Sequence, residues 1–490
     1  MSRPVAGGLV FFTSGAVLVL EILAGRLLAP YVGLSLETYT AVIATVLGGI
    51  ATGTSLGGRM ADRVHPRVML GPLMVGGGAL TMLAVPCVRL LGTLSGGSRE
   101  WVVPLSIAGL FAPAAVLSAV TPAVIKLQLR DLAVTGQVVG RLSALATAGA
   151  IAGTLVAGFV LVQAASTTTS ILVLGGLLMA AGTAMWLSVW GSTSSRLVAS
   201  VWAVAVVGTG LGVVMGDPCD AETVYHCARV VEDEGRPGGR LLVLDALEHS
   251  YVDLEDPTHL EFDYAKTVAD VLAATAPAGP LNALHVGGGG FTMPSYLRAV
   301  RPGSTSEVLE IDAGLVELAR DRLGLRTGPD LQVRVGDARL LVADLPMARQ
   351  DVVLGDAFGG LAVPWHLTTV EFARAIRATL RPGGTYVLNL IDFPPMRFAR
   401  AQVATLLAAF GQVAVIAPEA LIANEVGGNV VVVASDSPLD AEAIVAHIGS
   451  RGGQEEVLTG PAVTTFAEGA PVLTDDHAPV DQWLARSRRS

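Results

Sequence analysis

The stretch Ala283-Leu-His-Val-Gly-Gly-Gly-Gly290 joins a short, mainly apolar run directly to four glycines. An apolar run of this length before a glycine turn is typical of a buried β-strand. Glycine has no side chain, so such a loop lets the main chain approach a ligand closely. The stretch therefore predicts the first strand of a nucleotide-binding α/β fold, with Gly287, Gly288 and Gly289 against the nucleoside.

Four more apolar segments follow at intervals that leave room for helices. They are residues 307–312, 332–337, 351–356 and 385–390. Strands that alternate with helices build a parallel sheet covered on both faces, and ligands bind beyond the carboxyl ends of its strands. We therefore expect residues 277–490 to form a Rossmann-like nucleoside-binding domain of the methyltransferase type.

Acidic residues lie at the ends of three of these predicted strands. Glu310 follows the glycine loop by about 20 residues, the spacing at which an acid accepts hydrogen bonds from ribose hydroxyls. Asp337, followed by Ala338, ends the third strand, where a carboxylate can accept a hydrogen bond from an adenine amino group. Asp356 ends the fourth strand, close to the expected position of a transferred group. Together with the glycine loop, these acids predict an adenosine site.

Composition changes sharply at residues 216–219, where long apolar runs give way to frequent charges. Residues 230–253 contain short segments that predict strands, and residues 260–274 have the periodicity of an amphipathic helix. We therefore expect a small β-rich subdomain with a linking helix at residues 217–276, and a separate N-terminal domain at residues 1–216.

The N-terminal domain is too apolar for a soluble protein. Over the whole chain 52% of residues are hydrophobic and only 15% are charged, whereas soluble proteins have about 25% charged residues. Runs long enough to cross a bilayer are centred near Leu18, Ile43, Met74, Leu110, Ile151, Leu177 and Val206. They predict an α-helical membrane bundle of about seven spans, in a multi-pass protein whose partner is the bilayer of the cell membrane. The net charge of −10 argues against a nucleic-acid partner.

Several motifs resemble the spermidine synthase family. They are Leu244-Asp245, His285-Val-Gly-Gly-Gly-Gly290, Leu309-Glu-Ile-Asp312, Gly336-Asp-Ala338, Gly355-Asp356 and Leu473-Thr-Asp-Asp476. The resemblance is strongest to bacterial members fused to an N-terminal multi-span membrane domain. It implies transfer of an aminopropyl group from decarboxylated S-adenosylmethionine, a co-substrate rather than a cofactor, to putrescine or a related amine. Methylthioadenosine would be the second product.

The resemblance also implies roles for single residues. Asp356 matches the catalytic acid, which orients the acceptor amine and takes its proton. The implied nucleoside contacts are His226, Glu310, Asp337, Ala338 and Pro364. No metal ligand is predicted, because Cys219 and Cys227 lack a second pair at zinc spacing. A homodimer is compatible with the family.

Three positions depart from the family. Gly290 replaces an acid that binds an amine, Gly359 replaces a second acid three residues after Asp356, and Ala265 replaces a histidine after Tyr264. All three lost groups serve the acceptor amine or the aminopropyl chain. The resemblance therefore leaves the acceptor open.

The side of the membrane is also open. Arg59, Arg63, Arg67, Lys126, Arg130 and Arg141 fall in the second and fourth loops. The positive-inside rule places these loops in the cytoplasm, and seven spans then place the C-terminal domain outside. A domain that consumes a cytoplasmic sulfonium nucleoside belongs inside. Cys219 and Cys227 either form a disulfide, as in an oxidising compartment, or remain two thiols.

These features predict a polyamine aminopropyltransferase, and two alternatives remain. One is another S-adenosylmethionine-type group transfer, to an acceptor delivered through the membrane. The other is a non-enzymatic membrane transporter or sensor with a ligand-binding α/β domain. Glu21 within the first span, and a loop at residues 58–63 that resembles one in the major facilitator transporters, favour the latter.

Overall fold

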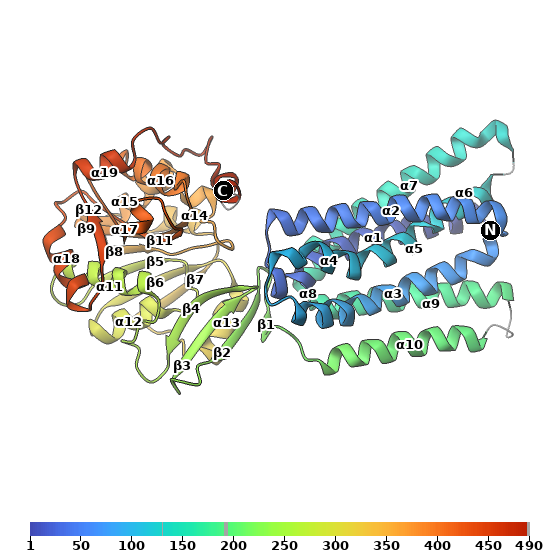
Figure 1. Ribbon diagram of the computed structural model, residues 1–490, viewed down its shortest axis with the longest axis horizontal. Helices are drawn as coiled ribbons and strands as arrows, with labels where there is room; N and C mark the ends of the chain where they lie inside the picture. The colour runs from blue at the N-terminus through green and yellow to red at the C-terminus, as the bar shows by residue number, and fades with distance from the viewer. Residues whose placement is uncertain (130, 191–194, 488–490) are drawn as a thin grey trace. The chain divides into compact units, whose positions relative to one another are not determined.

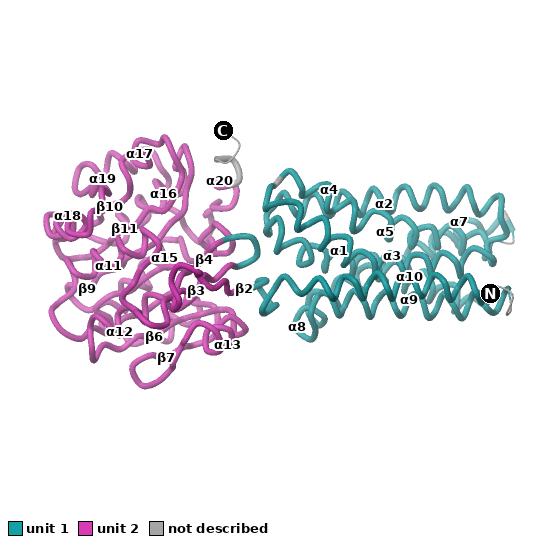
Figure 2. Tube along the Cα trace, turned by 60° about the horizontal axis from the view of Figure 1, so that its bottom comes forward, with its two compact units in different colours: residues 1–229, 244–247 teal, residues 230–243, 248–490 magenta. Residues whose placement is uncertain are grey.

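The computed structural model describes residues 1–129, 131–190 and 195–487, so Arg130 lies outside the described residues. The chain forms two compact units (Figure 2). The first comprises Met1–Arg229 with Leu244–Leu247, and the second comprises Val230–Val243 with Glu248–Ser490. The domain boundaries expected at residues 216 and 276 stay predictions.

The described part of the first unit contains seven helical segments that are long and apolar enough to cross a membrane (Figure 1). They are α1 (Arg3–Val32), α2 (Leu36–Arg63), α3 (Pro66–Leu94), Val102–Gln128, Thr135–Ala164, α9 (Thr167–Trp190) and α10 (Ser195–Val214). The fourth contains α4 (Val102–Ser106), η2 (Ile107–Phe111), α5 (Ala112–Ser118) and α6 (Val120–Gln128). The fifth contains α7 (Thr135–Val156), η4 (Ala157–Leu161) and α8 (Val162–Ala164). Each predicted centre lies within one of the seven segments, which confirms the predicted count.

Glycines let neighbouring helices of this unit approach to backbone contact. A Cβ atom on Gly149 of α7 would lie 2.1 Å from the carbonyl oxygen of Phe11 in α1. A Cβ on Gly53 of α2 would lie 1.9 Å from the carbonyl oxygen of Ala115 in α5. Small residues are the common means of close helix packing in lipid, where apolar burial gives no driving force between helices. The bundle therefore depends on these positions having no side chain.

The linker after α10, defined as residues 215–227, leads into a small antiparallel sheet. Its four-stranded sheet has the order β1 (Ala221–Glu222), β2 (Cys227–Glu232), β3 (Gly239–Leu244), β4 (Leu247–Asp253). Glu222 pairs with Cys227 in the β1–β2 ladder. Cys219 and Cys227 form a disulfide, so of the two sequence alternatives the structure has the disulfide.

The second unit is built on an eight-stranded sheet. Its order is β12 (Glu455–Leu458), β10 (Gln412–Pro418), β11 (Gly428–Ser435), β9 (Leu380–Asp392), β8 (Gln350–Gly355), β5 (Asn282–Val286), β6 (Thr305–Glu310), β7 (Leu331–Val335). Strands β5 to β9 are parallel, which confirms the five predicted strands. Strands β10, β11 and β12 join antiparallel at one edge and were not predicted.

Helices cover both faces of this sheet (Figure 1). One apolar core joins it to α11 (Asp263–Thr275), α12 (Thr292–Val300) and α18 (Ala441–Ser450). The other joins it to α14 (Ala338–Leu341), α15 (Val370–Thr379), α16 (Arg397–Leu407) and α19 (Pro461–Phe466). The remaining helices are α13 (Ala313–Arg322), α17 (Glu419–Ile422) and α20 (Val480–Ser487). The layered Rossmann-like fold predicted from the sequence is confirmed.

Gly149→Ala should destabilise the first unit, because its new methyl group would meet the Phe11 carbonyl. We expect a cost of about 1–3 kcal/mol, as for other overpacked interiors. The measurement is the thermal unfolding midpoint of the full chain in detergent. Gly176→Ala in α9 is the matched control, because nothing lies within 4 Å of its added Cβ. Equal midpoints for the two variants would contradict the packing argument.

Candidate functional site

The site lies where the strand order of the large sheet reverses. From β5 the chain continues through β6 and β7 on one side, and then returns through β8 and β9 on the other. The region beyond the carboxyl ends of β5 and β8 is therefore the usual ligand position in such a sheet. The backbone N–H of Asp356, just after β8, donates to the carbonyl of Val286 at the end of β5, at 2.9 Å.

Gly287 is the residue that lets these two loops meet. Its φ of +96° lies in the region that favours glycine. A Cβ atom there would lie 2.3 Å from the carbonyl oxygen of Asp356. Any other residue would push the ends of β5 and β8 apart, so the glycine sets the distance between these two strand ends.

Glu310 is buried at the end of β6 and is held by the glycine loop. Its Oε2 atom accepts hydrogen bonds from the backbone N–H groups of Gly288, at 2.8 Å, and Gly289, at 3.4 Å. Its Oε1 atom accepts from the N–H of Asp312 at 2.9 Å. The structure thus brings the predicted acid and the predicted loop together.

Asp356 accepts hydrogen bonds from two side chains on separate elements. The Tyr264 hydroxyl of α11 donates to Oδ2 at 3.2 Å, and Asn389 Nδ2 of β9 donates to Oδ1 at 2.9 Å. Asn429 of β11 donates in turn to Asn389 Oδ1 at 3.0 Å. Burial raises the pKa of Asp356, and the two hydrogen bonds oppose that rise. The result is an oriented carboxylate that ionises less readily than usual and can accept a proton.

Tyr264 is a donor to Asp356 across neutral pH. Burial, followed by the neighbouring Asp356 charge, raises the pKa of Tyr264 well above its usual range. Asn389 interrupts the apolar sequence of β9 and is almost fully buried. A polar residue in a buried strand needs a partner, which was the sequence signal for Asn389 that our prediction missed.

A small cavity of about 30 Å³ lies between the glycine loop, α11 and Asp356. Among its lining residues are His249, Ser250, Tyr264, His285, Gly288 and Asp356. Burial lowers the pKa of His285 to about 3, so its ring is neutral, and Nε2 lies 3.1 Å from Ser306 Oγ. The cavity has room for about two water molecules. A larger cavity of about 490 Å³ beside residues 380–384 contains none of the predicted site residues.

Asp337, Ala338 and Pro364 lie in the second unit beyond β7 and β8. Asp337 caps α14, since its Oδ1 accepts from the N–H of Arg339 at 2.8 Å. Ala338 is buried in the core, and Pro364 precedes the short helix η7 (Trp365–Leu367). His366 of η7 places Nε2 3.4 Å from Asp337 Oδ1. A histidine thus joins the turn after Pro364 to the predicted adenine contact, and the sequence did not single it out.

His226 is the one predicted contact that lies in the first unit. Its Nδ1 atom is 3.1 Å from Asp245 Oδ2. The other carboxylate oxygen of Asp245 accepts from the N–H of Cys227 at 2.9 Å. In the structure His226 is therefore part of the linker that carries the disulfide, and its contact with a nucleoside stays a prediction.

Gly290 and Gly359, two of the positions that depart from the family motif, differ in the space around them. At Gly290 a Cβ atom would lie 2.8 Å from Ser250 Cβ, and the Gly290 N–H donates to Ser250 Oγ at 3.0 Å. At Gly359 nothing lies within 4 Å of an added Cβ. Packing by Ser250 therefore excludes an acid at residue 290, whereas the space for one at residue 359 is open.

Asp356→Asn should stabilise the second unit at neutral pH. The folded state raises the pKa of Asp356 above its ordinary value of 3.8. Ionising this carboxyl therefore lowers the stability of the folded state as the pH rises above 3.8. We expect the thermal midpoint at pH 8 to rise by about 2–4 °C, with the gain shrinking toward pH 4. Asp344→Asn is the control, because that side chain is 74% exposed. A lower midpoint for Asp356→Asn at pH 8 would refute this account.

Comparison with known proteins identifies relatives of this part of the chain. A solved structure described as a probable spermidine synthase from Corynebacterium glutamicum ATCC 13032 is 31% identical, with a TM-score of 0.50; the match covers 52% of this chain and 95% of that one. The polyamine aminopropyltransferase of Vibrio vulnificus (strain CMCP6) is 30% identical over 165 residues, 33% of this chain and 53% of the relative. That of Chromobacterium violaceum is 25% identical over 160 residues, 32% of this chain and 60% of the relative.

These matches differ in extent. The chain spans between about half and three fifths of the length of these two curated relatives, but nearly all of the solved Corynebacterium structure. No protein-family model matches the chain.

Proposed function

The chain belongs to the spermidine synthase family, and on that premise we propose that it is a polyamine aminopropyltransferase. The observation that carries the proposal is Asp356, oriented by Tyr264 and Asn389 beside the glycine loop. Its donor would be decarboxylated S-adenosylmethionine and its acceptor putrescine or a related amine. We also propose that the seven apolar helices cross the cell membrane.

In the proposed reaction the acceptor amine attacks the methylene carbon beside the sulfonium sulfur. The new C–N bond forms as the C–S bond breaks. The electron pair of the C–S bond stays on sulfur and neutralises its positive charge as methylthioadenosine leaves. The amine proton passes to Asp356, whose raised pKa suits it to accept one. General-base help of this kind contributes about 10²–10⁴-fold to a rate.

The nucleoside would lie along the carboxyl ends of β5 to β8. Glu310 is already fixed against the glycine loop, so its oxygens can accept the ribose hydroxyls without reordering. Asp337 and Ala338 would contact adenine, with Pro364 on the same side. A homodimer remains compatible with this arrangement.

Asp356→Asn should lower kcat by about 10²–10⁴-fold, because the amide cannot take the proton. The measurement is methylthioadenosine release by the full chain in detergent, with decarboxylated S-adenosylmethionine and a panel of amines. Asp344→Asn should retain full activity. Amine-independent release, or equal rates for the two variants, would remove the aminopropyltransferase proposal.

The amine preference can be tested at the two departures. Gly359→Asp adds an acid in open space and should lower the KM for diamines about 10-fold, since a charge-assisted hydrogen bond contributes about 1.5–3 kcal/mol. Gly359→Asn is the matched neutral control and should leave KM unchanged. A diamine KM that Asp and Asn shift equally would show that residue 359 does not face the acceptor, and would favour an acceptor other than a diamine.

A further inference from the structure

The first unit has two chemically different ends. At one end, Arg141 Nη2 donates to the carbonyl of Arg3 at 3.2 Å, and Gln128 Nε2 donates to that of Met1 at 3.1 Å. At the same end, Lys126 Nζ lies 2.6 Å from Asp62 Oδ1. These contacts bring together the start of α1, the end of α2 and the connection between α6 and α7.

Basic residues concentrate at this end. Of the described residues, seven lie there, Arg3, Arg59, Arg63, Arg67, Lys126, Arg141 and Arg196, and three lie at the opposite end, Arg26, Arg89 and Arg99. Arginine and lysine near helix ends fix orientation, with the richer side facing the cytoplasm. Because α10 starts at the basic end, the linker after Val214 leaves from the opposite end.

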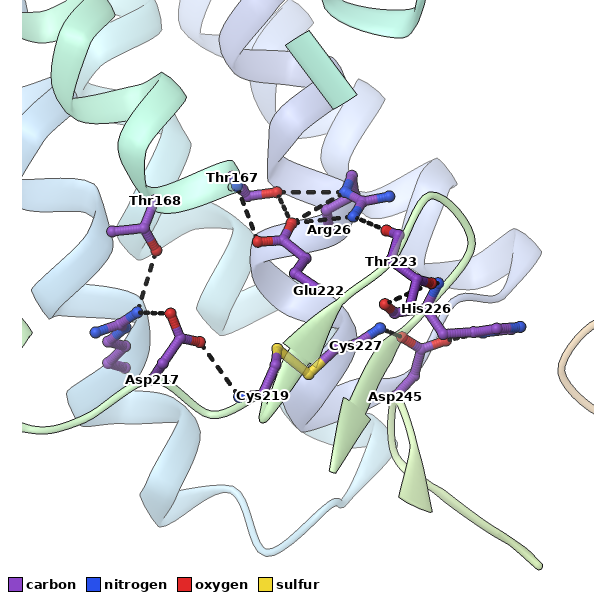
Figure 3. The surroundings of a disulfide bond; sticks show 11 residues. Arg26, Thr167, Thr168, Asp217, Cys219, Glu222, Thr223, His226, Cys227 and Asp245 are labelled. Carbon is purple, nitrogen blue, oxygen red and sulfur yellow. Dashed lines mark hydrogen bonds and ion pairs between the residues drawn. A yellow bond between two sulfur atoms is a disulfide. The ribbon is translucent and has the colours of Figure 1, made fainter. Parts of the chain in front are cut away.

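Two of the three arginines at that opposite end are bound to the linker, and Figure 3 shows the contact of Arg26. Arg26 Nη2 lies 3.1 Å from Glu222 Oε1, and both side chains are about 15% exposed. Arg89 Nη2 lies 3.3 Å from Asp217 Oδ2, and its Nη1 donates to the Gly212 carbonyl at 2.9 Å. Acidic groups of the linker therefore partly neutralise these two arginines, which increases the difference in positive charge between the two ends.

The disulfide is a second, independent observation at the same end. Cys219 and Cys227 are bonded within the linker, between Asp217 and Asp245 (Figure 3). Disulfides form and persist in oxidising compartments and are rare in the cytosol. Charge bias and disulfide chemistry therefore point to the same orientation, although neither depends on the other.

We propose that the linker and the second unit lie on the extracytoplasmic, oxidising side of the membrane. The disulfide closes residues 219–227 there, and Arg26 and Arg89 bind this linker to the bundle. The reaction then takes place outside the cytosol, so its sulfonium nucleoside has to be supplied on that face by an export or uptake step. The orientation does not rest on the proposed transferase activity.

Selective labelling of the native cysteines tests the orientation. In a Cys87→Ser background, spheroplasts expressing the full chain are treated with a membrane-impermeant reductant and then with an impermeant polyethylene-glycol maleimide. We expect a two-step gel shift in intact spheroplasts, only after reduction. The Cys219→Ser, Cys227→Ser double variant should not shift.

A cytoplasmic reference completes the experiment. His65, exposed between α2 and α3, lies at the basic end of the bundle. In the double-serine background, His65→Cys should be labelled only after lysis. Labelling of Cys219 and Cys227 only after lysis, labelling without reduction, or labelling of His65→Cys in intact spheroplasts would each overturn the proposal. None of these readouts requires enzymatic activity.

Discussion

The meeting of Gly287 with the Asp356 carbonyl is the contact on which the candidate site depends. Two parallel strands leave the sheet side by side there, and their loops touch because residue 287 has neither a side chain nor a preference for negative φ. That contact holds the glycine loop where its N–H groups reach Glu310. It also places the Asp356 carboxyl between α11 and β9. Backbone geometry thus decides where the acids lie.

Much of this arrangement follows from local sequence. Apolar runs predicted β5 to β9, and the spacing from the glycine loop placed Glu310 in the same predicted nucleoside site, because both features lie in neighbouring segments of the chain. The strands β10 to β12 were not predicted. Composition also could not have shown that they are antiparallel, because an apolar run has the same composition in either direction. The Tyr264–Asp356 hydrogen bond joins residues 92 positions apart, a pairing that only the folded chain determines.

Gly290 and Gly359 show why one substitution in a sequence can mean two things in a structure. At residue 290 the neighbouring Ser250 occupies the space and satisfies the backbone N–H. At residue 359 the space is open. The first glycine is required by packing, whereas the second leaves a side chain out of an otherwise accessible position. The two departures from the family motif therefore have separate physical causes.

The disulfide between residues 219 and 227 also bears on how the protein is made. It lies between the last long apolar helix and the second unit. With the proposed orientation, more than half of the chain has to pass through the translocation machinery before it can fold. Its cysteines would be oxidised early, as soon as residue 227 emerges, and the large sheet would close afterwards. If the proposed activity holds, nascent chains would then be inactive throughout their stay in the cytosol and would not consume the sulfonium nucleoside there during synthesis.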